Sequence, residues 1–199
     1  MPTLDEIRRA LDAHTPRVLP RATWHAAVAI VLHETTPETG SEILFIERAE
    51  REGDPWSGHM AFPGGRVDPG DPDPRSAAER ETLEEVGLDL ASADALNRLD
   101  DLEGSGAGPH SLVVSAFVYH VKTRGALSLN YEVSDALWIP VRALLDPTRH
   151  VAYPYPPDQT DMHYPGIVVG DPRRQVVWGL TYRFLDLFFA TLGRPLPSR

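Results

Sequence analysis

The chain has 199 residues and no cysteine. Without cysteine, the protein has no disulfide bond, no thiol nucleophile and no zinc site with cysteine ligands. Long apolar runs are also missing: the longest, Ala26 to Leu32, has seven residues, whereas a membrane-spanning helix needs about 20. The first residues lack the basic and apolar regions of a signal peptide. We therefore expect a soluble, cytoplasmic protein that does not contact a membrane.

Positive charge is scarce as well. Lys and Arg together number 19 against 29 Asp and Glu, which gives a formal net charge of −10. A net anion does not hold a phosphate backbone by bulk charge, so we expect no binding to nucleic acid. The length fits one domain, since domains commonly hold about 100–200 residues. We assign residues 1–199 to a single domain in which residues 1–20 form an N-terminal helix and extension.

The spacing of apolar residues predicts both helices and strands. Leu4, Ile7 and Leu11 recur at helical spacing, and a short helix is also expected near residues 141–145. Residues 146–165, which are rich in proline and tyrosine, are expected to form a long loop. Runs of apolar and β-branched residues predict strands at residues 24–32, 42–46, 60–62, 111–121 and 137–139. This irregular alternation indicates an α/β fold with a mixed sheet and helices packed on its faces.

The C-terminal segment predicts a helix over residues 171–193. Asp171 and Pro172 suit its first turn, and Gly193 suits its end. Two apolar stripes run along this helix, whereas a surface helix normally has one. Two interpretations stay open: the helix is deeply buried in its own chain, or it contacts a partner chain in a homodimer.

Residues 74–86 carry an unusual group of acids. Asp73 and Pro74 predict the start of a helix, and Gly87 predicts its end. At about 100° per residue, three carboxylates share one arc of this helix and three less polar residues share the opposite arc. The two sets are Glu81, Glu84 and Glu85, and Thr82, Leu83 and Val86. We expect the second arc to dock on the core and the first to present clustered negative charge.

Carboxylates crowded in this way repel each other unless a cation lies among them. Hard divalent cations such as Mg²⁺ or Mn²⁺ prefer all-oxygen sites of this kind. A solvated acidic helix face is the alternative. Gly64 and Gly65 favour the metal site, because glycines at a strand end allow a ligand to approach the backbone closely. Together the two segments predict a pocket for a metal-bound polyphosphate.

Residues 80–88, Arg-Glu-Thr-Leu-Glu-Glu-Val-Gly-Leu, resemble the second half of the Nudix box, so the chain is similar to the Nudix hydrolases. The first half departs from this pattern, because the glutamate position of the box falls on Pro72, and a shift of one residue brings Asp71, a shorter acid, near this position. The resemblance places the box region at residues 64–88. It implies a Nudix-type α/β/α sandwich with a mixed β-sheet between helices. It also implies hydrolysis of a nucleoside diphosphate linked to another moiety.

The resemblance further implies residue roles. The catalytic residues and ligands of Mg²⁺ or Mn²⁺ would be Glu81, Glu84 and Glu85. Gly65 would add a backbone carbonyl to the metal, and Arg80 would join the catalytic set by holding Glu84 in place. The general base is either one of these glutamates or a carboxylate from another loop, for which Glu132 is the candidate.

Arg48 and residues 58–68 are similar to the coenzyme A diphosphatase branch of the same family. Ala49 and His59 depart from the branch pattern, which has serine and glutamine at these positions. The narrower resemblance implies coenzyme A or its acyl derivatives as the substrate. Another dinucleotide, a nucleotide sugar or a modified nucleoside triphosphate stays open, as does a non-catalytic domain that only binds a nucleotide. Arg48 and Arg66 are candidates for contacting the substrate phosphates, and His59 for facing the pocket.

Overall fold

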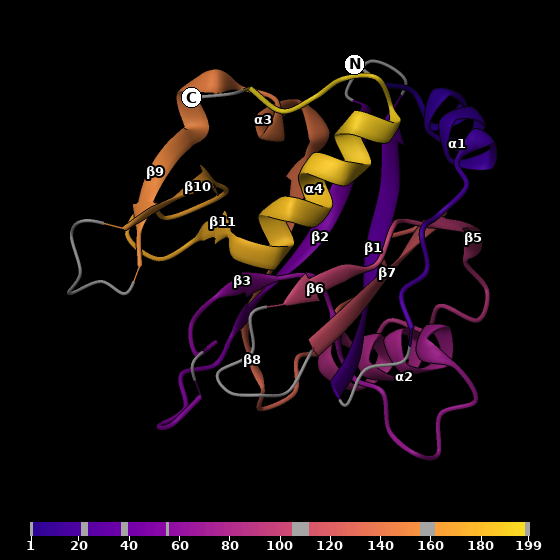
Figure 1. The fold of residues 1–199 in the computed structure, drawn as a ribbon, viewed down its shortest axis with the longest axis horizontal. Helices are drawn as coiled ribbons and strands as arrows, with labels where there is room; N and C mark the ends of the chain where they lie inside the picture. The colour runs from indigo at the N-terminus through magenta and orange to yellow at the C-terminus, as the bar shows by residue number, and fades with distance from the viewer. Residues whose placement is uncertain are drawn as a thin grey trace.

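The computed structural model describes residues 2–20, 24–36, 40–54, 56–104, 112–155 and 162–197. Within these ranges, eight strands form the main sheet (Figure 1). Its strands are β1 (Trp24–Thr36), β2 (Gly40–Arg48), β3 (Met60–Ala61), β4 (Gly64–Arg66), β5 (Asp94–Arg98), β6 (Leu102–Gly104), β7 (Leu112–Val121) and β8 (Val133–Pro140). The expected strand start at Ser111 lies outside the described residues.

The main sheet is mixed and is built around β1. Strands β1 and β7 pair in parallel, whereas β2 and β4 pair with β1 in antiparallel orientation. The path through the sheet is β3-β2-β1-β7-β5, with β8 added on β2 and β6 on β7. The apolar run of β1 does not alternate with polar residues because both of its faces are buried: Ile30 packs in one core cluster and Ala29 in the other.

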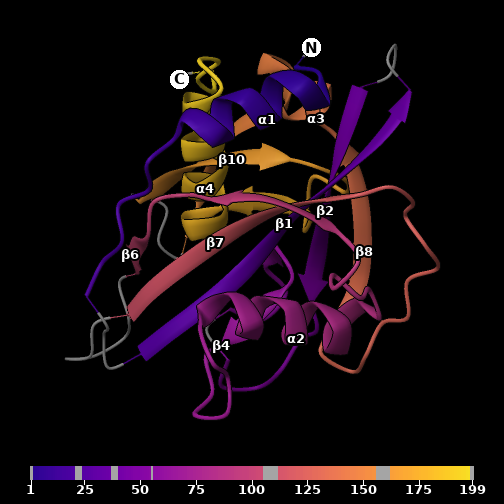
Figure 2. The same cartoon turned by 90° about the vertical axis from the view of Figure 1, so that its right-hand side faces the viewer.

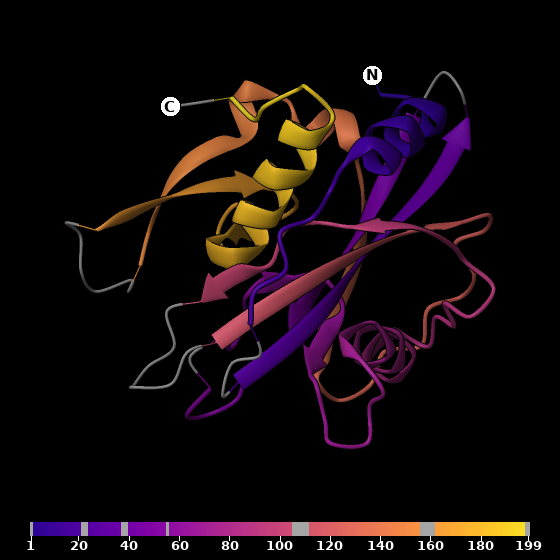
Figure 3. The same cartoon turned by 45° about the vertical axis from the view of Figure 1, so that its right-hand side comes forward.

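Helices cover both faces of this sheet. The α2 helix (Pro74–Val86) packs on one face, and α1 (Leu4–Ala13), α3 (Val141–Leu144) and α4 (Gly179–Thr191) contribute to the core on the other. Figures 2 and 3 show the sheet between α2 on one side and α1 and α4 on the other. The expected α/β/α sandwich with a mixed sheet is therefore confirmed. Among the described helices, none is long and apolar enough to cross a membrane.

The C-terminal helix is shorter than the sequence predicts. It begins at Gly179 rather than Asp171, because residues 171–175 close a turn in which the Gln175 amide donates to the Asp171 carbonyl. Strand β11 (Val176–Trp178) then follows the turn. The helix buries four apolar side chains inside its own chain: Phe184, Leu185, Phe188 and Phe189. Burial within the chain thus accounts for both apolar stripes, and the homodimer stays a prediction.

The expectation of one long loop over residues 146–165 is wrong for the part that the structure describes. A short 3-10 helix, η1 (Pro147–Arg149), leads into β9 (His150–Pro154), and β10 begins at His163. Strands β9, β10 (His163–Val168) and β11 form a second, three-stranded sheet in the order β11-β10-β9. Residues 156–161 of the expected loop lie outside the described residues. The second sheet carries tyrosines that reach the vicinity of β3, as shown below.

Candidate active site

The α2 helix is fixed at both ends by the residues that the sequence suggested. The Asp73 carboxylate accepts the Ser76 amide at 2.8 Å, and Gly87 ends the helix in the left-handed region with φ of 69°. The Thr82 hydroxyl, which is fully buried, donates to the Ala78 carbonyl at 2.7 Å. This hydrogen bond lets a polar residue occupy the face of the helix that docks on the sheet.

The docked face differs from the expected one. Leu83 was expected to dock on the core, but it is 49% exposed. Glu85 was expected to share an exposed acidic arc, but it is only 2% exposed. The docked face instead includes Ala77 and Ala78, whose small side chains bring the helix close to the sheet. Glu84 does face solvent, with 55% of its side chain exposed.

Glu85 lies under the turn into β4. The Gly64 amide donates to Glu85 Oε2 at 2.8 Å. Burial raises the pKa of the Glu85 carboxyl to about 8, and the nearby Glu81 charge raises it further, while the Gly64 amide and Arg48 oppose the shift. Gly64 has φ of 148°, and a Cβ atom there would lie 2.3 Å from the Ala27 carbonyl oxygen. Only glycine therefore allows this approach of backbone to carboxylate.

Glu81 lies beside the second glycine. A Cβ atom on Gly65 would lie 2.5 Å from Glu81 Cδ, so the missing side chain leaves the room that the carboxyl occupies. Burial raises the pKa of Glu81, although Arg80 donates to its Oε1 at 2.9 Å and lowers it. Two carboxyl groups with raised pKa thus lie along one side of β4. The pKa of each would fall if a cation bound beside it.

Arg80 binds Asp71 more closely than its expected partner Glu84. Its Nε and Nη2 donate to the two Asp71 oxygens at 3.0 Å each, whereas both distances to Glu84 are 3.5 Å. The pair holds the pKa of Asp71 below its usual range and that of Arg80 above. Arg80 also donates to the Arg66 carbonyl at 3.1 Å. Asp71 therefore helps to hold the arginine that orients Glu81.

Glu132 lies in the same electrostatic environment as the α2 carboxylates. Its charge raises the pKa of both Glu81 and Glu85. The chain before it is held at the end of α2, because the Asn130 amide donates to the Glu85 carbonyl at 3.0 Å. The Glu132 carboxylate itself lies 3.1 Å from Arg51 Nη1.

The three expected substrate contacts occupy two different places. Arg48 donates to Asp54 at 2.9 Å, and its charge acts on both Glu85 and His59. The pKa of His59 is lowered mainly by burial, so its ring is held neutral. The guanidinium of Arg66 instead stacks over the Trp24 ring, 3.9 Å from its centroid. The structure thus brings Arg48 and His59 together, with the charge of Arg48 acting on Glu85, and places the Arg66 side chain on Trp24.

Two further groups were not indicated by the sequence pattern. Glu79 accepts from Arg75 at 2.8 Å and from the Tyr119 hydroxyl at 2.9 Å, which gives it partners away from Glu81. The Gly64 amide on Glu85 was also missed, since backbone donors leave no signal in a side-chain motif.

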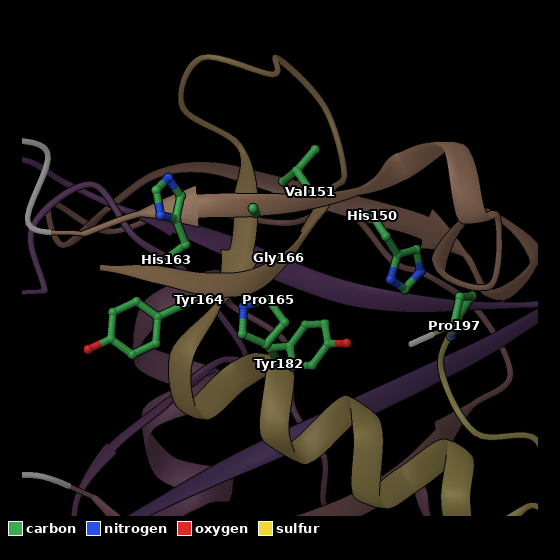
Figure 4. Close-up of a pocket in the computed structure, with 9 residues that line it drawn as sticks. His150, Val151, His163, Tyr164, Pro165, Gly166, Tyr182 and Pro197 are labelled. Atoms are coloured by element: carbon green, nitrogen blue, oxygen red, sulfur yellow. The ribbon is translucent and has the colours of Figure 1, made fainter. Parts of the chain in front are cut away.

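Two cavities of the described structure are lined by residues other than the α2 carboxylates. One cavity of about 310 Å³ lies between β9, β10 and α4, with His163, Tyr164 and Tyr182 among its lining residues (Figure 4). A second, of about 240 Å³, lies beside Arg75 and Tyr119. None of the residues that line the two cavities is a glutamate of α2.

Comparison with known proteins places this arrangement in a family. The model of the NUDIX domain matches residues 23–159, which include β4, α2 and Glu132. The chain belongs to the Nudix family. Membership supports the expected class of activity, hydrolysis of a pyrophosphate bond.

Two solved Nudix structures are similar to this chain in fold, and one further protein is similar in sequence. A Nudix family protein from Enterococcus faecalis has a TM-score of 0.58 at 15% identity, covering 96% of this chain and 70% of that one. A Nudix hydrolase from Alicyclobacillus acidocaldarius has a TM-score of 0.51 at 20% identity, covering 61% and 81%. An uncharacterised protein of Schizosaccharomyces pombe is 35% identical over 158 residues, which are 69% of this chain and 48% of that protein. The chain thus spans about half the length of this relative. These matches do not single out the coenzyme A branch.

The residues of this Nudix site fit a divalent cation. Glu81 and Glu85 offer oxygen ligands, the Glu84 carboxylate lies one turn from Arg80, and Gly65 has no side chain to block the approach. Within the described ranges, no three His, Asp or Glu side chains are already gathered as a preformed metal site. The carboxylates are instead turned towards Arg80 and the Gly64 amide. These side chains would have to turn away from those donors to share one ion.

Proposed function

We propose that the chain is a metal-dependent hydrolase that cleaves the diphosphate linkage of a nucleoside diphosphate joined to another moiety. The observation that carries the proposal is the buried Glu85 carboxyl beside Glu81, both with a raised pKa. Burying acids side by side opposes folding unless a bound proton or a cation compensates for their charge. Bound Mg²⁺ or Mn²⁺ would provide that compensation.

Glu81, Glu84 and Glu85 would hold the metal, with the Gly65 carbonyl as a further ligand. When bound, the metal neutralises phosphate charge and makes a water molecule more acidic. Arg80 orients the Glu81 carboxylate through their 2.9 Å hydrogen bond. This role is supported by the pairing of Arg80 with Asp71, which fixes the guanidinium from its other side.

Glu132 is the proposed general base. Its electrostatic effect on Glu81 and Glu85 supports this role, since a base must lie near the metal ligands to reach the attacking water. Its carboxylate would accept the proton of that water. Arg48 would contact a substrate phosphate, because its guanidinium acts on Glu85 from the side of β2. The Arg66 side chain is a weaker candidate for a phosphate contact, since it stacks on Trp24.

We propose coenzyme A or an acyl derivative as the substrate. The support is the similarity of Arg48 and residues 58–68 to the coenzyme A branch, together with the proximity of Arg48 and His59. We propose that the protein binds a small-molecule nucleotide and not nucleic acid. A cytoplasmic location and a homodimer stay predictions. A molar mass equal to that of one chain, by size exclusion with light scattering, would contradict the homodimer.

The test is a hydrolysis panel in Mg²⁺ or Mn²⁺ with coenzyme A, dinucleotides, nucleotide sugars and nucleoside triphosphates, whose products are identified by mass. We expect one class to be cleaved at its diphosphate, with no cleavage in EDTA. Glu85→Gln should reduce turnover at least roughly 100-fold. Glu79→Gln, on the same helix but bound to Tyr119 and Arg75, should stay within a few-fold of the parent protein. Full activity in EDTA, or an active Glu85→Gln, would contradict the proposal, and binding without cleavage would indicate a sensor.

A further inference from the structure

Four aromatic rings gather around Trp178, where β11 ends and α4 begins. Their centroids lie 4.4 to 5.7 Å from that of Trp178. The rings around it are those of His59, Tyr153, Tyr155 and Tyr164. We call Trp178 and these four residues the Trp178 cluster. Each is only partly buried, so the cluster presents ring surface to solvent as well as packing on itself.

The Trp178 cluster lies next to Arg48, the proposed phosphate contact. His59, which precedes β3, accepts the Arg48 amide at its carbonyl at 3.0 Å. Arg48 in turn acts electrostatically on Glu85. Only three residues, Ala61 to Pro63, separate Met60 of β3 from Gly64, whose amide binds Glu85. A ligand whose phosphates contact Arg48 would thus lie close to His59, a member of the cluster.

The second sheet is fastened to the main sheet at this point. Glu47, which is 5% exposed and precedes Arg48 in β2, accepts from Arg174 at 2.8 Å and from Gln175 at 2.8 Å. The Thr181 hydroxyl donates to the Met60 carbonyl at 3.3 Å. Figure 1 shows β11 close to β3, in agreement with these bonds. The distance between Arg48 and Trp178 is therefore fixed by buried contacts from both sides.

We infer that the Trp178 cluster is the binding surface for the base of the nucleotide substrate, with its diphosphate directed to Arg48 and the α2 carboxylates. Aromatic side chains stack on nucleobases because each base has a π-face, and the neutral His59 ring adds no charge that would require solvent. The inference rests on the proposed function for the position of the diphosphate. Tyr131, 80% exposed and packed on Arg51 near Glu132, is the rival aromatic surface on the other side of the carboxylates.

Two probes distinguish the contribution of the base to binding from that of the diphosphate. By titration calorimetry in Mn²⁺, adenosine diphosphate should bind more tightly than inorganic pyrophosphate, which has no base. Tyr155→Leu should weaken the binding of adenosine diphosphate about tenfold, as expected for loss of one stacking partner. The affinity for pyrophosphate should not change. Tyr155→Phe should restore binding because it keeps the ring. The Tm of each variant shows whether it is folded, and Tyr153→Leu serves as the second variant if Tyr155→Leu is not.

Three results would overturn the inference: equal affinity of the two probes, an unchanged affinity for adenosine diphosphate in the leucine variants, or a loss that appears in Tyr131→Leu instead. If the proposed function is wrong, the parent protein will show no metal-dependent hydrolysis, which is a different observation. The binding measurements do not depend on turnover, so the two failures are distinguishable.

Discussion

Replacing Glu85 by glutamine should stabilise the metal-free protein while it inactivates the enzyme. Glutamine is nearly isosteric with the protonated acid and can still accept the Gly64 amide at its carbonyl oxygen. The substitution therefore removes the buried charge and keeps the hydrogen bond. A residue that serves a bound cation is expected to weaken the fold when the cation is absent.

The magnitude follows from the pKa. Burial raises the pKa of Glu85 from 4.5 to about 8. A raised acid pKa means that the folded state binds the proton more tightly than the unfolded state, so stability falls as pH rises from 4.5 towards 8. At 1.36 kcal/mol per pKa unit, the loss is about 1 kcal/mol at pH 5, about 3 kcal/mol at pH 7 and about 5 kcal/mol at pH 9. The glutamine variant lacks this loss.

Urea unfolding of both proteins in EDTA, from pH 5 to pH 9, measures the difference directly. We expect the free-energy difference to grow with pH and to favour Glu85→Gln throughout. Mn²⁺ should then stabilise the parent protein and have much less effect on the variant, because metal binding displaces the proton from Glu85. A difference that stays constant across this pH range would refute the reasoning, since it would mean that the carboxyl is not desolvated.

Two further substitutions test the surroundings of the carboxylates. Gly64→Ala should lower the free energy of unfolding by at least about 2 kcal/mol, because its Cβ atom would lie 2.3 Å from the Ala27 carbonyl in a backbone conformation with φ of 148°; an unchanged Tm would contradict this geometry. Asp71→Ala should cost about 1.5–3 kcal/mol in urea unfolding at neutral pH, because it removes the carboxylate that accepts two hydrogen bonds from the Arg80 guanidinium. Since the pKa of Asp71 is lowered, this difference should disappear as pH falls through that pKa, and a constant difference would argue against the ion pair.

The sequence predicted the parts of the fold that depend on local signals. The capping residues of α2 and the apolar run of β1 identify their elements, because each pattern acts within one helix or strand. The second sheet was missed since Pro165 lies in its central strand β10, opposite Ala152, where proline normally argues against a strand. Its strands are consecutive along the chain and pair with their neighbours, so the proline, and not a distant partner, concealed this sheet.

The helical arc of α2 shows why the candidate site was only partly predictable. At about 100° per residue, the buried residues Ala77, Ala78 and Thr82 lie on an arc centred near Glu85. A prediction from hydrophobicity alone places the centre of the docked arc near Val86 and Leu83, because such a prediction assigns every glutamate to the solvent side. The two alanines were the available signal, since small residues mark the face on which a helix approaches its neighbour closely. The residue that breaks the amphipathic pattern is thus the one to which the chemistry is assigned, as expected where function and folding make opposite demands on one side chain.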